Sequence, residues 1–160
     1  MGSIMDKKNT IGLLLITIMF TAHFAHATRS GTFSVKANKP GGTLFKSPYD
    51  SDMRVRCEFF ASGRWTYNPN VGYHGANGHP KYSRASSVYR LPGHPEGSLI
   101  AKKNGKKYYY VGNEAAFQLT KRDSLRFVIN DSDIGGSYSD NRGTVEVEWY
   151  CEKRGVSREY

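Results

Sequence analysis

Two short segments with alternating apolar residues limit what this chain can fold into. Residues 124–129 place Leu125, Phe127 and Ile129 on one side, and residues 144–151 alternate in the same way. A period of two predicts strands that bury one face. Between the two segments lies a glycine-rich stretch with several acidic and amide side chains. We therefore expect two β-strands joined by a polar loop.

That loop is a candidate metal site. It carries the oxygen-bearing side chains of Asn130, Asp131, Asp133, Asp140 and Asn141. Calcium takes roughly six to eight oxygen ligands from carboxylates, amides and carbonyls held by a flexible loop. Asp, Asn, Ser and Gly are also the ordinary residues of turns, so a polar turn without metal is the alternative interpretation.

The remaining sequence predicts further strands and no helix. Strands are expected at residues 31–37, 54–60, 98–102, 106–111 and 115–119. Asn104-Gly105 predicts a tight hairpin turn, and the Gly-, Pro- and Ser-rich stretch 38–49 is expected to be a loop. Short strands at this spacing indicate an all-β protein, a β-sandwich. Its sheets should share an apolar face formed by Val55, Phe59, Leu125, Phe127, Ile129, Val145, Val147 and Trp149.

Residues 63–89 show no clean period but are rich in glycine, proline and aromatic side chains. An irregular segment of this length in a small domain is usually functional or disordered. Its tryptophan and tyrosines argue against disorder, which is depleted in such residues. We expect this segment to be a functional loop.

The first 27 residues read as an export signal. Charged residues 6–8 precede an apolar run at 11–22, and residues 25–27 give an A-x-A end. This arrangement predicts a secretory signal peptide, and the run is shorter than the roughly 20 residues of a membrane span. We expect cleavage after residue 27, one domain over 28–160 with its core in 31–151, and no membrane span. The mature protein would be exported, either periplasmic or extracellular.

The chain is basic. Its 23 Lys and Arg residues against 14 Asp and Glu residues give a net charge of +9 at pH 7. Such a surface attracts anionic glycans, lipopolysaccharide or nucleic acid at low salt. Export argues against nucleic acid as a partner. A well-solvated basic surface without a dedicated polyanion site is the alternative.

The two cysteines should pair. Cys57 shares a strand face with Val55 and Phe59, and Cys151 shares one with Val147. Both thiols should therefore point inward, where two packed strands would bring them together. In an oxidising compartment one disulfide is the simplest expectation. The alternative, a metal ligand or a nucleophile, lacks a second cysteine nearby.

Motifs for catalysis and modification are sparse. The sequence contains no G-x-S-x-G, H-E-x-x-H or Walker pattern, so we expect a protein that is not an enzyme. A glycosidase pair made of Glu58 or Glu114 with Asp131 is the enzyme alternative, but the spacing selects no such pair. The stretch 130–132 matches the acceptor pattern for N-glycosylation.

The residue types fit sugar binding instead. A bound calcium ion can take two hydroxyls of a sugar ring as ligands. Polar side chains then select the hydroxyls, and aromatic rings cover the apolar face of the sugar. The loop after residue 129 offers the ion site, and the aromatic and histidine side chains of residues 65–82 offer the rest.

Several short motifs also occur in a characteristic order. They are FSVKAN at 33–38, ASGRWTY at 61–67, His79-Pro80, GSLI at 97–100, Asn130-Asp131 and YSDNRG at 138–143. In this order and spacing the chain resembles the PA-IL-like galactophilic lectins, small calcium-dependent bacterial sugar-binding β-sandwiches. The resemblance covers about residues 31–151, and it implies a jelly-roll-like sandwich.

The resemblance implies a calcium site and names its ligands. Tyr67 and Ser137 would contribute backbone carbonyls, and Asp131, Asp140 and Asn141 would contribute side-chain oxygens. Calcium is therefore the cofactor we expect.

The resemblance also implies sugar contacts of galactose type. They would come from His79, from Tyr82 three positions further on, and from Asp131 and Asp140. In the family the position of Tyr82 is usually glutamine.

The chain departs from the family in three further ways. The loop between Asp131 and Tyr138 is about two residues longer, so Asp133 is expected to replace or join a calcium ligand. Asp140 stands where the family pattern has asparagine, which adds a negative charge. The cysteine pair has no counterpart in the family.

Two functions from different classes follow from the sequence. The first is an exported calcium-dependent lectin, whose partner is a glycan. The second is an exported sandwich module without sugar activity that binds anionic envelope or host components through its basic surface. An oligomer is compatible with the first, because linked weak sites bind more strongly together.

Overall fold

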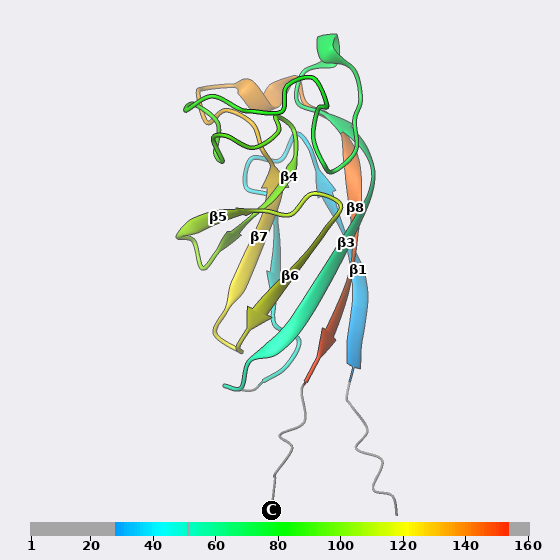
Figure 1. Cartoon of the computed structure of the whole chain (residues 1–160), viewed down its shortest axis with the longest axis vertical. Coiled ribbons are helices and arrows are strands. Elements are labelled where there is room, and N and C mark those ends of the chain that lie inside the picture. The colour runs from blue at the N-terminus through cyan, green and yellow to red at the C-terminus, as the bar shows by residue number, and fades with distance from the viewer. Residues whose placement is uncertain (1–27, 51, 154–160) are drawn as a thin grey trace, which may run out of the picture.

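Two antiparallel four-stranded sheets pack face to face in the computed structural model (Figure 1). The sheets have the orders β1-β8-β3-β6 and β2-β7-β4-β5. The strands are β1 Thr28–Lys36, β2 Thr43–Lys46, β3 Val55–Thr66, β4 Leu99–Lys103, β5 Lys107–Tyr110, β6 Glu114–Leu119, β7 Ser124–Ile129 and β8 Arg142–Glu152, with 3-10 turns η1 Pro69–Val71 and η2 Ser137–Ser139. The predicted all-β sandwich is confirmed.

The structure describes residues 28–50 and 52–153. The predicted signal peptide, residues 1–27, lies outside the described residues. Within the described part of the chain, no helix has the length and hydropathy needed to cross a membrane.

The prediction for residues 38–49 was wrong in part, because this stretch contains strand β2. β2 is four residues long, pairs with β7 at the edge of the second sheet, and buries Phe45 while Leu44 faces outward. A strand of this length has too few alternating positions to be distinguished from the glycine and proline around it.

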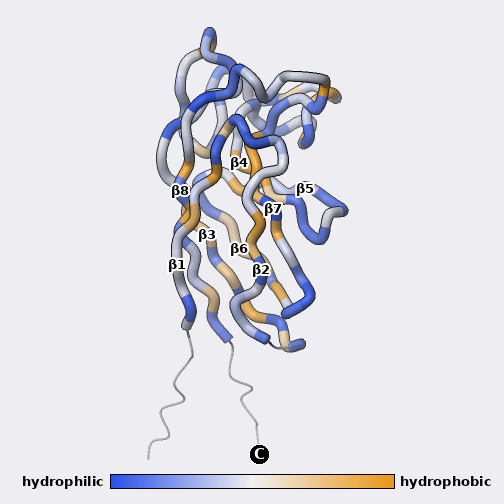
Figure 2. The backbone as a smooth tube through the Cα atoms, turned by 180° about the vertical axis from the view of Figure 1, so that it is seen from behind, coloured by the Kyte–Doolittle hydropathy of each residue, from blue (hydrophilic) through white to orange (hydrophobic). Residues whose placement is uncertain are grey.

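The core lies between the sheets and contains the predicted apolar face. Phe59 of the first sheet lies 5.0 Å from Phe45 and 4.9 Å from Phe127 of the second sheet, between ring centroids. Seven of the eight predicted core residues are buried, namely Val55, Phe59, Leu125, Phe127, Ile129, Val145 and Val147. Figure 2 shows the hydrophobic segments concentrated in the strands.

The eighth predicted core residue, Trp149, is only partly buried. Its indole lies over the backbone of Gly31 on the neighbouring strand, where an added Cβ would come within 3.0 Å of the ring. The ring also makes an edge contact with Phe45, at 5.2 Å between centroids. Trp149 therefore closes the side of the core.

Cys57 and Cys151 form the expected disulfide, and both are fully buried. They do not link two packed sheets across the core. They are direct partners in the register of β3 and β8, with Cα atoms 4.0 Å apart. Both cysteine side chains point to the inner face of the first sheet. The bond therefore joins two adjacent strands of that sheet.

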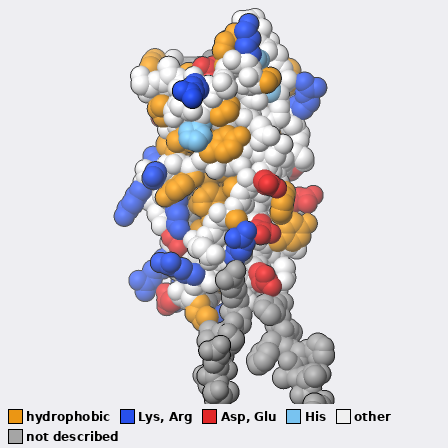
Figure 3. Space-filling model, in the orientation of Figure 1, with side chains coloured by type: hydrophobic (Ala, Val, Ile, Leu, Met, Phe, Trp, Pro, Cys, Tyr) orange, Lys and Arg blue, Asp and Glu red, His pale blue; other side chains and the backbone are white. Residues whose placement is uncertain are grey.

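The outer faces of the two sheets differ in charge. The first sheet presents Glu58, Glu114, Glu146, Glu148 and Glu152, and we call this side the acidic face, although Lys36, Arg56, Arg64 and Arg142 also lie on it. The second presents a basic face that consists of Lys46, Lys102 and Arg126. In Figure 3 most acidic side chains lie on the right at mid-height and several basic side chains lie along the left edge, with other basic side chains at the top and the upper right.

The long connections gather at one end of the sandwich, which we call the loop end. It contains the β3–β4 connection and the β7–β8 connection, whereas β1 begins and β8 finishes at the opposite end (Figure 1). The pairing of β3 with β8 runs the length of the molecule, from Arg56 opposite Glu152 to Thr66 opposite Arg142. The next residues along the two segments, Tyr67 and Asn141, therefore both lie at the loop end.

Replacing Cys57 and Cys151 together by alanine should lower the free energy of unfolding by about 4 to 5 kcal/mol on the chain-entropy argument, because the bond closes a loop of 94 residues. Urea unfolding followed by tryptophan fluorescence measures the change. The parent reduced under denaturing conditions and refolded without oxidant is the control, and it should lose a similar amount. A loss below about 1 kcal/mol would contradict the entropic account.

Candidate metal and sugar site

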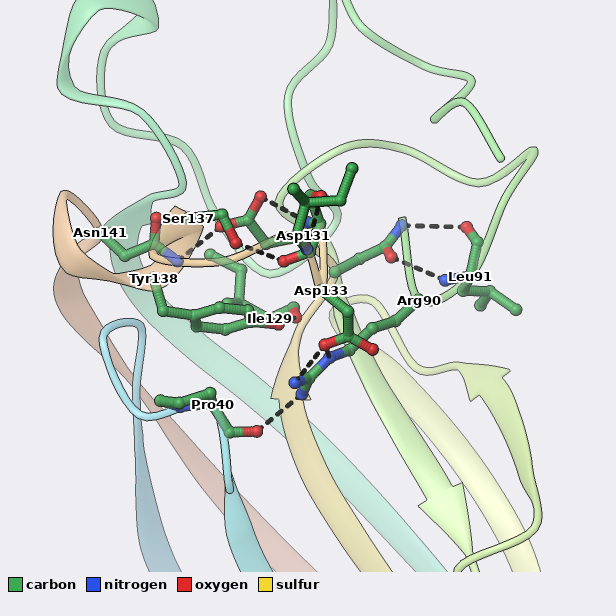
Figure 4. A network of polar contacts seen from close by, with 12 residues as sticks. Pro40, Arg90, Leu91, Ile129, Asp131, Asp133, Ser137, Tyr138 and Asn141 are labelled. Carbon is green, nitrogen blue, oxygen red and sulfur yellow. Dashed lines mark hydrogen bonds and ion pairs between the residues drawn. The ribbon is translucent and has the colours of Figure 1, made fainter. Parts of the chain in front are cut away.

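Asp131 and Asn141 form the centre of the site, and both are buried in the loop end. Asp131 follows β7 and is 4% exposed, and Asn141 precedes β8 and is 0% exposed. The Asn141 Nδ2 donates to Asp131 Oδ2 at 2.9 Å and to the carbonyl of Ala37 at 3.2 Å. The backbone N–H of Ser132 donates to the other Asp131 oxygen at 2.7 Å. Figure 4 shows Asp131 and Asn141 pointing toward one another.

The remaining oxygen of Asn141 is buried and has no hydrogen-bond partner among the described residues. Turning the amide over would not satisfy it, because Nδ2 is already fixed by two acceptors. A buried acceptor without a donor costs about 1 to 3 kcal/mol. A cation placed against this oxygen would remove that cost. The residues present therefore fit an oxygen-coordinated ion.

The Asp131 carboxyl is held where its charge is disfavoured. Burial raises its pKa above the ordinary 3.8, and the negative charge of Asp140 adds to the rise. Hydrogen bonds from Asn141 and Ser132 and the positive charge of Arg90 act in the opposite direction without cancelling it. A carboxylate in this position would be stabilised by a nearby cation.

The other expected ligands lie close to this centre. Tyr67 directly follows the last β3–β8 pair, Thr66 opposite Arg142, and is buried at the loop end. Asp140 ends η2, is exposed and acts electrostatically on Asp131. Ser137 begins η2, and its hydroxyl donates to the carbonyl of Ser132.

Asp133 has a different partner from the other acids of the loop. Its Oδ1 lies 2.6 Å from both Nε and an amino nitrogen of Arg90, and Figure 4 shows it pointing away from Asn141. Arg90 also donates to the carbonyl of Pro40 at 2.7 Å and lies 4.7 Å from the ring centroid of Tyr138. Arg90 thus fastens three loops together, and the 131–138 loop supplies its acidic partner.

Asn130 is a second fastening point. Its side-chain oxygen accepts from the N–H of Leu91 at 2.9 Å, and its amide donates to the carbonyls of Leu91 and Pro95 at 3.1 and 3.2 Å. Because Asn130 is 0% exposed, the glycosylation pattern at residues 130–132 does not present an accessible acceptor. The residue holds the β3–β4 connection against the start of the acidic loop.

A cluster of rings lies next to the Asp131–Asn141 centre. Tyr67 contacts His74, His79 and Tyr89, with ring centroids 5.7, 6.5 and 6.3 Å away. Burial and hydrogen bonds to the Glu96 carboxylate raise the pKa of both the Tyr67 and the Tyr89 hydroxyl. Both tyrosines therefore stay neutral, and Glu96 holds the two rings in place.

Gly97 makes this ring packing possible. Its backbone has a positive φ of +70°, and an added Cβ would come within 2.3 Å of the His74 ring and 2.6 Å of the Tyr67 ring. Its carbonyl accepts from the indole N–H of Trp65 at 2.8 Å. Any side chain at this position would push the rings away from the loop end.

Both ring nitrogens of His79 already have partners. The Nδ1 accepts from the backbone N–H groups of Lys81 and Tyr82 at 3.2 and 3.4 Å, so Nε2 carries the proton and donates to the carbonyl of Val71 at 3.1 Å. The Tyr82 ring packs on the imidazole at 4.8 Å between centroids and is 38% exposed. Tyr82 is thus the ring that this pair offers to solvent.

The enzyme alternative is not supported by the placement of its residues. Glu58 and Glu114 lie on the acidic face of the first sheet, whereas Asp131 follows a strand of the second sheet at the loop end. In residues 28–50 and 52–153, no three side chains of the His, Cys, Asp or Glu type gather into a metal-binding group. An ion at the loop end would need amide and carbonyl oxygens besides the two carboxylates.

The fold resembles a solved structure described as a lectin. The chain is similar to a structure described as the EclA N-terminal domain, a PllA-like lectin, with 23% identity over 76% of this chain and 95% of that chain and a TM-score of 0.55. It is also matched to AJLec from the sea anemone Anthopleura japonica, with 15% identity, 77% and 92% coverage and a TM-score of 0.43, too low to carry an argument. The first similarity supports the fold. No family model and no curated protein matches the sequence.

The raised pKa of Asp131 predicts how the stability of the metal-free protein changes with pH. The carboxyl contributes stability that is complete below its ordinary pKa of 3.8 and is lost as pH rises through the higher folded-state value. In chelator, the Asp131→Asn variant should therefore lose less stability than the parent as pH rises from about 4 to 7.

Urea unfolding at several pH values, in chelator throughout, measures this dependence. Asp50→Asn removes the same charge from an exposed position away from the site and is the matched control. Parallel pH profiles for the parent and Asp131→Asn would contradict the electrostatic description of the site.

Proposed function

We propose that the protein is a calcium-dependent carbohydrate-binding protein whose site is the loop end. The observation that carries the proposal is the buried Asn141 oxygen without a partner, beside the Asp131 carboxylate whose charge is disfavoured by burial. Both groups lack what a divalent cation would supply. The similarity in fold to a structure described as a lectin is consistent with this function.

The proposed ion ligands are oxygen atoms from three segments. Asp131, Asp140 and Asn141 would bind through their side chains, and Tyr67 and Ser137 through their backbone carbonyls. Asp133 is left out of the set, because its carboxylate is paired with Arg90. When bound, calcium would supply coordination positions for two hydroxyls of a sugar ring.

The chain's own residues would orient the sugar. Asp131 and Asp140 would accept hydrogen bonds from the hydroxyls that reach the ion. His79, fixed at both ring nitrogens, would hold Tyr82 in position, and the exposed Tyr82 ring would pack on the apolar face of the sugar. Galactosides are the first class to test, as the sequence resemblance implies.

Export is part of the proposal. The Cys57–Cys151 disulfide supports it, because disulfides persist in oxidising compartments and are rare in the cytosol. A glycan outside the cytoplasm is then the partner that such a site would meet.

Isothermal titration should detect calcium binding to the protein, and an Asp131→Ala, Asp140→Ala double variant should abolish it. The matched control is Asp133→Asn, which removes an acid from the same loop and should retain the affinity within about threefold. No heat of binding in the parent would refute the calcium site. Equal loss in the control would show that loop charge, and not the proposed ligands, binds the ion.

Sugar binding should depend on both calcium and Tyr82. On a glycan array the protein should bind in calcium and not in chelator, and Tyr82→Ala should weaken galactoside binding about fivefold to tenfold through loss of ring packing. Tyr82→Phe keeps the ring and should bind like the parent. Calcium binding without retention of any glycan would reject the carbohydrate function while leaving the ion site intact.

A further inference from the structure

The basic face of the second sheet contains an ordered row of side chains in the strand register. Leu44 of β2 is opposite Arg126 of β7, Arg126 is opposite Lys102 of β4, and Lys102 is opposite Tyr108 of β5. Direct cross-strand neighbours lie about 5 Å apart at their Cβ atoms. Two cations are thus held side by side between an exposed leucine and a half-buried tyrosine.

This arrangement is unfavourable in the protein alone. Like charges directly opposite one another on antiparallel strands destabilise a sheet. Among the described residues, neither Arg126 nor Lys102 forms an ion pair with an acid. Arg126 donates to the carbonyl of Gly41 at 2.8 Å, and the Lys102 ammonium lies 4.9 Å from the centroid of the Tyr108 ring. Both cations therefore remain available to an external anion.

Another cation extends the row, and the four described strands of the second sheet contain no acid. Lys46 lies two residues after Leu44, on the same outer face of β2. Toward the loop end, burial raises the pKa of the Tyr108 hydroxyl, while the charge of Arg90 lowers it and that of Asp133 raises it. Asp133 is already paired with Arg90. The basic face is therefore continuous with the loop end.

We propose that the row formed by Arg126, Lys102 and Tyr108 is a subsite for an anionic polysaccharide, with the two cations binding sulfate or carboxylate groups and the tyrosine contacting a sugar ring. Arg126 offers a planar fork for such groups, and Lys102 offers a point charge. The subsite is separate from the calcium ligands, so its binding does not depend on calcium.

An anionic polysaccharide fits the row better than a second copy of the chain. The acidic face of the first sheet has the complementary sign, but one of its five carboxylates is already paired with Arg56, and two accept from hydroxyls of Ser34 and Tyr150. The row also ends in a tyrosine ring, which is a typical partner for a sugar ring. A flexible charged chain can follow the row, whereas a flat acidic sheet would have to expel water from two charged faces.

The test measures retention and affinity on heparin and on polygalacturonate, with neutral dextran as the uncharged probe and chelator present throughout. The Lys102→Gln, Arg126→Gln double variant should bind heparin about fivefold to tenfold more weakly than the parent at low salt. The slope of log affinity against log salt should become shallower by about two, one for each cation removed. Binding to heparin alone would assign sulfate, and binding to both polymers would assign anionic groups generally.

The matched control is Lys36→Gln with Arg54→Gln, which removes the same charges from positions outside the second sheet. It should retain the parent affinity. Equal weakening by both double variants would overturn the proposal in favour of net charge alone, as would a parent that is not retained on either polymer. Salt-sensitive self-association in sedimentation that is lost in Lys102→Gln, Arg126→Gln would assign the face to a second copy and would also overturn it.

Discussion

The antiparallel pairing of β3 with β8 is the interaction on which the rest of the structure depends. It is tied by the Cys57–Cys151 disulfide toward one end and reaches Thr66 opposite Arg142 at the other. A slip of one residue would turn the core side chains outward, because faces alternate with a period of two. The same slip would separate Tyr67 from Asn141. The covalent bond therefore fixes a register that brings two distant segments of the sequence together at the loop end.

The loop end holds its polar groups in fixed positions, but some of them lack a hydrogen-bond partner among the described residues. Asn130 and Arg90 fasten the irregular connections through backbone carbonyls, as a buried loop requires. Within that frame folding leaves the Asn141 oxygen and the Asp131 carboxyl at a cost, and among the described residues His74 Nε2 and Ser98 Oγ of the β3–β4 connection are also buried without a partner. The first two are the groups that the proposed cation would satisfy.

The periodicity of the sequence predicted most of the strands, but the sequence did not predict the tertiary contacts of the loops. The bounds of β7 were predicted without error, and the inward direction of Cys57 and Cys151 was confirmed, because both follow from alternation. β2 was missed because four residues carry too little pattern. The expected ligands came from short motifs in a known order, and of these the structure joins Asp131 and Asn141 by a hydrogen bond. The roles of Arg90 and Glu96 had no local signal, because their partners lie in other parts of the sequence.

The separation of charge between the two sheets has a consequence for the whole molecule. A mixed outer face with five glutamates and four cations on one side and a basic face on the other give the sandwich an electric dipole moment across its thickness. Near an anionic wall or capsule, the field would rotate the molecule until the second sheet faced inward. The long axis would then lie along the surface, and the loop end would point sideways. In that orientation, glycans that lie parallel to the surface would be the ones within its reach.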